Sequence, residues 1–270
     1  MMQNALARAE QALDALRATR KDAGTRPSTS RAAQAGSTTR TASATTRAAT
    51  TCSSSTIFGT EWGPMHWGHV SSADLVTWRH EPVALAPSVE ADRDGVFSGS
   101  AVVSDDDELV LYFTGHRWRN GVNEDEGNLQ VQCAAVSTDG ITFEKKGVVV
   151  DCPEGLVHFR DPKVWRMDGT WYMVVGACST DDRGEVWLYT SADGERWEFD
   201  RVVFRDPDPD VFMLECPDMF PLGGQVGDRL RPDGRAAGRL PASQRPQRRV
   251  RGRSLGPGHG FRAADGLPAT

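Results

Sequence analysis

The sequence predicts an all-β protein made of repeated antiparallel units, and a β-propeller fits this pattern best. Between residues 60 and 223, short runs rich in β-branched and aromatic residues recur, such as ELVLYFTG, LQVQCAAVS and EVWLYTS. Turns that contain Asp-Gly separate many of these runs, which is typical of antiparallel meanders. SSADLVTWRHEP, STDGITFEKKG and SADGERWEFD look like three versions of one hairpin, which favours repeated four-stranded blades. A β-sandwich is the structural alternative.

Composition narrows the class of protein. The chain has 270 residues, a formal net charge of −6 and five cysteines. The negative charge argues against a nucleic-acid partner, and an odd number of cysteines without a CxxC pair argues against a disulfide framework or a structural zinc site. The sequence shows neither a signal peptide nor an apolar stretch long enough to span a bilayer. We therefore expect a cytoplasmic protein with reduced thiols and no membrane partner.

Eight tryptophans are many for a chain of this size. In a β-rich protein, clustered indole rings suit sugar binding, because a flat ring stacks on the C–H face of a sugar. For any single tryptophan, core packing is the more common explanation.

The N-terminal region, residues 1–26, is predicted to form a helix. Residues 3–21 are rich in Ala, Leu, Arg and Glu, and Leu6, Leu13 and Leu16 recur at helical spacing. We expect this helix to dock on or cap the β-domain, without chemistry of its own.

Two other regions, 27–57 and 224–270, do not look like folded protein. Residues 24–56 contain no Asp, Glu, Val, Leu, Ile, Phe, Tyr or Trp, and residues 225–270 hold ten arginines but a single aromatic residue. Such segments bury too little apolar surface to offset the loss of chain entropy, so both are predicted to be disordered. A natural linker and a basic tail are one interpretation, and translation out of frame is the other.

Four stretches within residues 58–223 together resemble glycoside hydrolase family 32, the β-fructofuranosidases, which includes invertases and sucrose-6-phosphate hydrolases. They are EWGPMHWGHVSSADLVTWRHEPVALAP, FSGSAVV, FRDPKVW and ECPDMFPL. Each is weak alone, but their order and strand context make the resemblance specific. It implies a five-bladed β-propeller, incomplete here, followed in the family by a C-terminal β-sandwich that we expect to be missing.

The resemblance assigns the chemistry to paired carboxyl groups, as retaining glycoside hydrolysis requires. The Glu of Glu-Cys-Pro, here Glu215, corresponds to the general acid/base, and its place at the end of the apolar run VFML would raise a carboxyl pKa. The Asp of Arg-Asp-Pro, here Asp161 beside Arg160, corresponds to the residue that holds fructosyl hydroxyls and favours the transition state. The alternatives are a surface glutamate at a strand end and an exposed ion pair of little energetic worth.

The resemblance also implies sugar contacts from Trp62, Phe97 and Ser98. His66 and Trp67 are more simply explained as packing and hydrogen-bonding groups of the first blade, and Cys216 as a small neighbour of the acid/base. A second Arg-Asp-Pro, residues 205–207, lies in an acidic loop with no strand leaving it, so we reject it as a site.

The family nucleophile, the Asp of a Trp-x-Asn-Asp-Pro-Asn-Gly motif, has no counterpart in this sequence. GSTTRTAS, residues 36–43, stands at the expected place. Codons compatible with it, read one base earlier, encode Trp-Ile-Asn-Asp-Pro-Asn-Gly-Phe. The same offset allows TTCSSSTI, residues 50–57, to read Tyr-His-Leu-Phe-Phe-Gln-Tyr-Asn, another family segment. We therefore infer a shifted reading frame across residues 27–57. The composition after residue 223, which is rich in Arg, Gly, Pro and Ala, suggests a second shift.

These observations predict a retaining glycoside hydrolase that releases fructose from sucrose or sucrose 6-phosphate and needs no cofactor or metal. Because the nucleophile is missing, the chain as it stands is expected to be inactive. The alternatives are an exo-acting fructan- or arabinan-cleaving enzyme and a catalytically dead carbohydrate-binding protein. Nucleic-acid binding through the basic tail is disfavoured, because its arginines lack interleaved aromatic residues.

Overall fold

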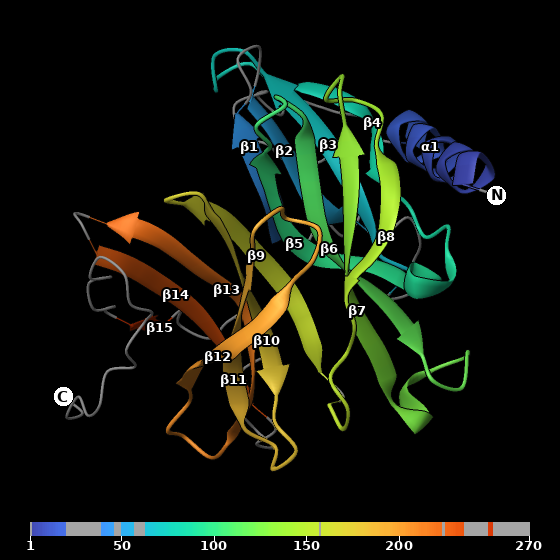
Figure 1. Ribbon diagram of the computed structural model, residues 1–270. Coiled ribbons are helices and arrows are strands. Elements are labelled where there is room, and N and C mark those ends of the chain that lie inside the picture. Colours follow the sequence, from blue (N-terminus) through green and yellow to red (C-terminus); the bar gives the residue numbers. More distant parts are fainter. Residues whose placement is uncertain are drawn as a thin grey trace. The chain divides into compact units, whose positions relative to one another are not determined.

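The computed structural model describes residues 2–19, 39–45, 50–56, 63–156, 158–222, 225–234 and 248–250 (Figure 1). The chain divides into two compact units, Met1–Asp151 and Cys152–Thr270. Within the described residues, no helix is both long and apolar enough to cross a bilayer.

In the first unit, the described residues form one α-helix and two antiparallel four-stranded sheets, each a meander in chain order. The first sheet comprises β1 (Thr39–Thr45), β2 (Thr50–Thr56), β3 (His66–Ser72) and β4 (Arg79–Leu85). The second comprises β5 (Gly95–Val103), β6 (Leu109–Trp118), β7 (Asn128–Ser137) and β8 (Glu144–Val150). The short 3₁₀ turns η1 (Glu90–Asp92) and η2 (Glu124–Glu126) lie in the connections before β5 and before β7.

The predicted N-terminal helix is present as α1 (Met2–Thr19) and lies beside β4 in Figure 1. Ala5 and Ala9 are buried against Val83 and Ala86, and Leu6 packs at the edge of this cluster. The side chains of Leu13 and Leu16 are outside the described set. The helix therefore docks on the first sheet, as expected, through small residues that allow a close approach.

The second unit repeats the meander and adds a further sheet. The meander comprises β9 (Phe159–Met167), β10 (Thr170–Cys178), β11 (Gly184–Ser191) and β12 (Glu198–Arg205). The added sheet comprises β13 (Val211–Leu222), β14 (Gln225–Gly234) and β15 (Arg248–Val250). A buried cluster that includes Val174 of β10, Leu188 of β11 and Leu214 of β13 packs the meander against the added sheet. The all-β prediction and its four-stranded units are thus confirmed.

Within the ranges 27–57 and 224–270, which are predicted to be disordered, the structure describes four strands, and the remaining residues of both ranges lie outside the described set. Strands β1 and β2 lie within the first range, and β14 and β15 lie within the second. Backbone pairing explains this, because β2 pairs with the edge of β3 and β14 pairs with β13 through main-chain groups that every sequence carries. The many threonines of β1 and β2 are β-branched and suit a strand. The shifted reading frame of these segments stays a prediction.

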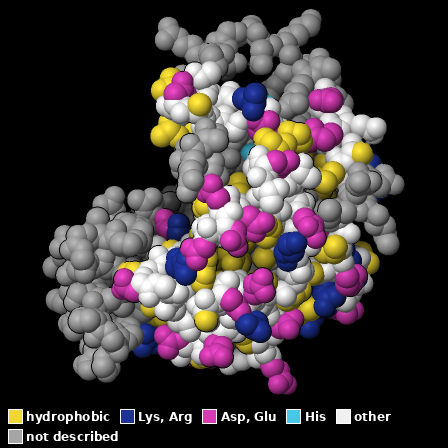
Figure 2. Space-filling view, turned by 45° about the horizontal axis from the view of Figure 1, so that its top comes forward, with side chains coloured by type: hydrophobic (Ala, Val, Ile, Leu, Met, Phe, Trp, Pro, Cys, Tyr) yellow, Lys and Arg dark blue, Asp and Glu magenta, His cyan; other side chains and the backbone are white. Residues whose placement is uncertain are grey.

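Charged side chains of both signs are interspersed on the face shown in Figure 2. Among the described residues on that face, no broad basic patch is visible. The expectation that the chain does not bind nucleic acid stays a prediction.

The three similar hairpins of the sequence form the same hydrogen-bonded turn. In each, a serine at the end of a strand donates to an aspartate two residues later, which accepts backbone N–H groups of the turn. These pairs are Ser72 with Asp74, Ser137 with Asp139, and Ser191 with Asp193. The backbone N–H of Thr142 is the largest cause that lowers the pKa of Asp139 to about 2. The three repeats recognised in the sequence therefore share one type of side-chain-capped turn.

The turn at Asp139 predicts an acid-sensitive contribution to stability. Asp139 accepts from the backbone N–H groups of Ile141 and Thr142 at 2.8 and 2.7 Å. Because its pKa is lowered on folding, this contribution is present above pH 3.8 and is lost as the pH falls toward about 2. We expect Asp139→Ala to lower the free energy of unfolding by about 1 kcal/mol at pH 7, the usual effect of removing a side-chain cap. Urea denaturation at several pH values measures it.

Asp139→Asn is the matched control, because it keeps the acceptor oxygen but loses the titration. It should cost less than Asp139→Ala, and the difference from the native chain should narrow below pH 3. An Ala variant as stable as the native chain at pH 7 contradicts this account.

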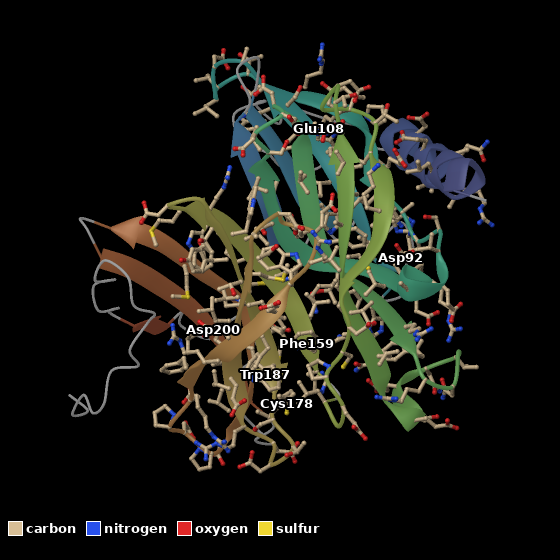
Figure 3. The ribbon with its side chains drawn as sticks, in the orientation of Figure 1. Asp92, Glu108, Phe159, Cys178, Trp187 and Asp200 are labelled. Carbon is tan, nitrogen blue, oxygen red and sulfur yellow. The ribbon has the colours of Figure 1, made fainter. Side chains whose placement is uncertain are left out.

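A buried ion pair connects η1 to β8 in the first unit. The side chains of Lys145 and Asp92 are 5% and 0% exposed, and their charged groups are in direct contact. Lys145 also donates to the Ala86 carbonyl at 2.7 Å, and Asp92 accepts from the Ser88 backbone N–H at 2.8 Å. Burial lowers the pKa of Lys145, although Asp92 opposes this effect. Figure 3 labels Asp92 at this position in the unit.

Removing one partner of this pair should be strongly destabilising. We expect Lys145→Met to lower the free energy of unfolding by about 3–5 kcal/mol, because Asp92 is left buried without its counter-charge. The double variant Lys145→Met with Asp92→Asn removes the uncompensated charge and should recover much of the loss. Chemical denaturation of the four members of the cycle measures the coupling, and additive losses would contradict a direct interaction.

Candidate active site

Asp161 lies in a β-bulge near the start of β9. Arg160 pairs with Gly176 and Lys163 pairs with Val174, so that Asp161 and Pro162 oppose a single residue of β10. Pro162 has no N–H to give to the ladder, and Asp161 has a φ of 67°. A bulge of this kind redirects a side chain out of the regular pleat.

Glu215 adjoins a second bulge, on β13. Glu215 and Asp218 pair with residues 231 and 229 of β14, so Cys216 and Pro217 share one partner. Cys216 has a φ of 48°, and again a proline follows. Left-handed backbone at a non-glycine residue costs about 1–3 kcal/mol and persists where the surroundings impose it. Both candidate segments therefore carry local strain, which is a feature of functional sites.

The two bulges are joined by hydrogen bonds across 55 residues of sequence. The backbone N–H of Cys216 donates to Oδ2 of Asp161 at 2.8 Å. Nη2 of Arg160 donates to Oε1 of Glu215 at 2.9 Å, and Nε of Arg160 lies 4.0 Å from Oδ2 of Asp161. The structure thus brings together the three residues that the sequence placed on two separate motifs.

The exposed ion pair considered from the sequence is not what the structure shows. Arg160 and Asp161 are 8% and 6% exposed. Burial by itself lowers the pKa of Arg160, but the carboxylates of Glu215 and Asp161 outweigh burial, so the pKa is raised. Burial also raises the pKa of Asp161, with the Arg160 guanidinium opposing the shift and the charge of Glu215 adding to it. The Glu215 side chain is 23% exposed and remains open to a ligand.

Gly176 allows β13 to approach β10 beside these residues. A Cβ atom at Gly176 would lie 2.1 Å from the carbonyl oxygen of Leu214, which is backbone and cannot swing aside. Phe159, labelled in Figure 3, precedes Arg160 and packs against the ring of Trp187 with centroids 6.1 Å apart. The close backbone contact and the buried rings fix the strand ends that present Arg160 and Glu215.

Phe97 and Ser98, predicted to contact sugar, lie on β5 of the first unit, also at a bulge. The register shifts between Phe97 and Gly99, and both Phe97 and Ser98 are half-buried. The Phe97 ring stacks on His116 with centroids 4.2 Å apart, and Trp67 donates its indole N–H to the Phe97 carbonyl at 3.0 Å. Trp67 is fully buried, so its expected packing role is confirmed. Trp62 lies outside the described residues.

The second Arg-Asp-Pro is engaged in other contacts. Arg205 binds Glu185 at 3.1 Å and also contacts Asp181, both on the β10–β11 side of the blade. Asp206 is 1% exposed and accepts from the backbone N–H of Asp208. These contacts give residues 205–207 a structural explanation, in line with their rejection as a site.

Sequence reasoning missed His158. Its Nδ1 lies 2.9 Å from Nη1 of Arg160. The signal was available, because residues 158 and 160 stand two apart at a strand end and so share a face. In the part of the chain that the structure describes, no group of three or more His, Cys, Asp or Glu side chains could hold a metal ion.

Comparisons with known proteins identify the family of the chain. The profile described as "Glycosyl hydrolases family 32 N-terminal domain" matches residues 55–241, and the chain belongs to this family. It is 52% identical to the sucrose-6-phosphate hydrolase of Escherichia coli over 164 residues, which cover 61% of this chain and 34% of that protein. It is 50% identical to the raffinose invertase of Escherichia coli over 161 residues, which cover 60% and 34%. The chain thus spans about a third of the length of these relatives.

Solved structures of the same family share the fold. The Bombyx mori GH32 beta-fructofuranosidase BmSUC1 superimposes with a TM-score of 0.63 at 36% identity, covering 73% of this chain and 43% of that chain. Fructan 1-exohydrolase IIa from Cichorium intybus gives a TM-score of 0.67 at 24% identity, covering 88% and 46%, and so supports the fold alone. The four-stranded meanders are accordingly blades of a β-propeller.

The close approach of β13 to Gly176 predicts that a methyl group added at Gly176 destabilises the fold more than one added at Gly184. We expect Gly176→Ala to lower the free energy of unfolding by about 1–3 kcal/mol, the range typical of overpacking. Gly184→Ala is the matched control, because its Cβ would meet the same strand at 3.1–3.2 Å and needs a smaller adjustment. Urea denaturation ranks the two, and equal effects would show that β13 is not held by this contact.

Proposed function

We propose that the β-domain is the catalytic part of a β-fructofuranosidase-type glycoside hydrolase that releases fructose from sucrose or sucrose 6-phosphate. The observation that carries the proposal is the buried arrangement in which Arg160 links Glu215 to Asp161. Its support comes from relatives named for sucrose 6-phosphate and raffinose, and from the Bombyx mori relative, one variant of which was solved in complex with sucrose.

The proposed reaction follows the retaining route. Glu215 protonates the leaving glycosidic oxygen and later removes a proton from the attacking water. Asp161 accepts hydrogen bonds from fructosyl hydroxyls and stabilises the positive charge that develops on the ring. Arg160 keeps both carboxylates in place in a poorly solvated setting, where charges act more strongly than in water. Sugar contacts from Phe97, Ser98 and Trp62 are proposed on the family motifs alone.

The proposal includes a defect in the chain as it stands. The family nucleophile is an aspartate in a motif that this sequence lacks, and without it no covalent fructosyl intermediate forms at the usual place. Loss of the nucleophile costs roughly 10⁶-fold in turnover in a serine hydrolase. We attribute the loss to a reading-frame shift over residues 27–57. Resequencing of this stretch, with peptide mass spectrometry of the product, tests that attribution, and an intact frame that encodes the printed residues refutes it.

The missing motif also favours a second candidate, a carbohydrate-binding protein without turnover. A fructan- or arabinan-directed exo-enzyme is the remaining alternative, and ECPD together with FSGS favours the fructose-specific choice. The sugar is expected to be the ligand in each case, with no nucleic-acid or membrane partner, and we place the protein in the cytoplasm.

Sugar binding by the chain as it exists distinguishes these possibilities. We expect fructose to bind in a titration calorimeter, and Asp161→Asn to weaken the affinity about tenfold, because a charge-assisted hydrogen bond contributes roughly 1.5 kcal/mol. Asp206→Asn is the matched control, since it alters the other Arg-Asp-Pro and should leave the affinity unchanged.

A sucrose hydrolysis assay in parallel reports turnover. Binding without turnover in the printed chain, with turnover in a frame-restored chain that Glu215→Ala abolishes, supports the proposed enzyme. Equal effects of the two Asp→Asn variants on fructose affinity would remove Asp161 from the site.

A further inference from the structure

We propose that His158 is a positioning residue whose unprotonated Nδ1 holds the Arg160 guanidinium in the orientation that binds Glu215, and that proton uptake by His158 releases this arrangement. The contact itself is independent of the proposed function, and its consequence for sugar binding rests on that function.

The donor and acceptor roles in this contact are set by chemistry. Nη1 of Arg160 lies 2.9 Å from Nδ1 of His158, and a guanidinium can only donate. Nδ1 must therefore offer its lone pair, which means that this nitrogen carries no proton while the contact exists. His158 is thus held neutral with its proton on Nε2.

One rigid group connects His158 to Glu215. Nη1 of Arg160 faces His158, and Nη2 of the same planar guanidinium donates to Glu215 at 2.9 Å. Because the fork of donors is rigid, fixing one nitrogen fixes the direction of the other. The position of His158 therefore determines where Arg160 meets the proposed acid/base.

His158 is held by two neighbouring strands. Its ring packs edge to face on Phe212 of β13, with centroids 5.4 Å apart and planes at 62°. The backbone carbonyl of His158 accepts a hydrogen bond from the N–H of Cys178 on β10 at 2.9 Å. Phe212 stands three residues before Glu215, so the strand that presents Glu215 also supports the ring that positions Arg160.

Protonation of Nδ1 would replace attraction by repulsion. Among the described residues, the titratable groups linked to His158 by contacts are Arg160 at its ring, Glu215 and Asp161 through Arg160, Cys178 of β10 at its backbone carbonyl, and Cys216 of β13 through Asp161. The nearest is the cation Arg160, which is 8% exposed and so is poorly screened by water. A protonated ring would face a second donor and a like charge, and Arg160 would have to turn away from Glu215.

Histidine NMR on the full-length chain tests the contact directly. With ¹⁵N-labelled histidine at pH 7.5, we expect the signal that disappears in His158→Asn to show an unprotonated Nδ1 and a protonated Nε2. In Arg160→Met this preference should weaken, and Nδ1 should take up a proton at a higher pH than in the native chain. A protonated Nδ1 in the native chain, or a titration that Arg160→Met leaves unchanged, would overturn the proposal whether or not the chain binds sugar.

Two substitutions of His158 separate positioning from mere packing. His158→Asn keeps an acceptor oxygen near the place of Nδ1 but does not titrate, and His158→Leu keeps the bulk but has no acceptor. We expect native fructose affinity to fall as the pH is lowered and His158 takes up a proton. His158→Asn should bind without this fall, and His158→Leu should bind about tenfold more weakly throughout.

The NMR measurement and the fructose titration test separate parts of the proposal, so their negative results have different meanings. Circular dichroism checks folding, and His158→Asn keeps the test decisive if His158→Leu does not fold. A His158→Asn variant that retains the native pH dependence, or a folded His158→Leu variant with native affinity, would contradict the positioning role. If no chain binds fructose, the proposed function fails, while the NMR measurement still decides the contact between His158 and Arg160.

Discussion

The hydrogen bond from the Cys216 backbone N–H to the Asp161 carboxylate is the constraint on which the candidate site depends. It joins two strands of different sheets at their bulges, 55 residues apart in sequence. The bulge exposes the N–H that an ordinary ladder would use, and the proline that follows each strained residue contributes no donor of its own. The bulges that distort β9 and β13 therefore also supply the hydrogen bond that links these two strands.

The charges of Arg160, Asp161 and Glu215 affect one another strongly in this site. Two carboxylates and one guanidinium lie together with little exposure, so neither their attraction nor their repulsion is well screened. Burial and Glu215 raise the pKa of Asp161, and the two carboxylates keep Arg160 charged in spite of burial. Arg160 is the compensating charge that makes the pair of acids tolerable, and any group that orients Arg160 acts on both of them.

The rest of the second unit serves to place these strand ends. The buried cluster of β10, β11 and β13 and the glycine at position 176 let two backbones touch where Arg160 and Glu215 meet. The recurring serine–aspartate turns close the hairpins of successive blades in the same way.

Strand periodicity, turn chemistry and short motifs are local features. They were enough to predict the all-β class, the repeated hairpins, the family and the candidates Arg160, Asp161 and Glu215. The sequence predicted disorder where β1, β2, β14 and β15 lie, since side-chain composition does not report main-chain pairing with a neighbouring strand. The burial of the Arg160–Asp161 pair and its contacts with Glu215 and His158 could not be predicted from the sequence. Those facts depend on contacts between β9 and β13, and such contacts are fixed by packing across the chain and not by neighbours along it.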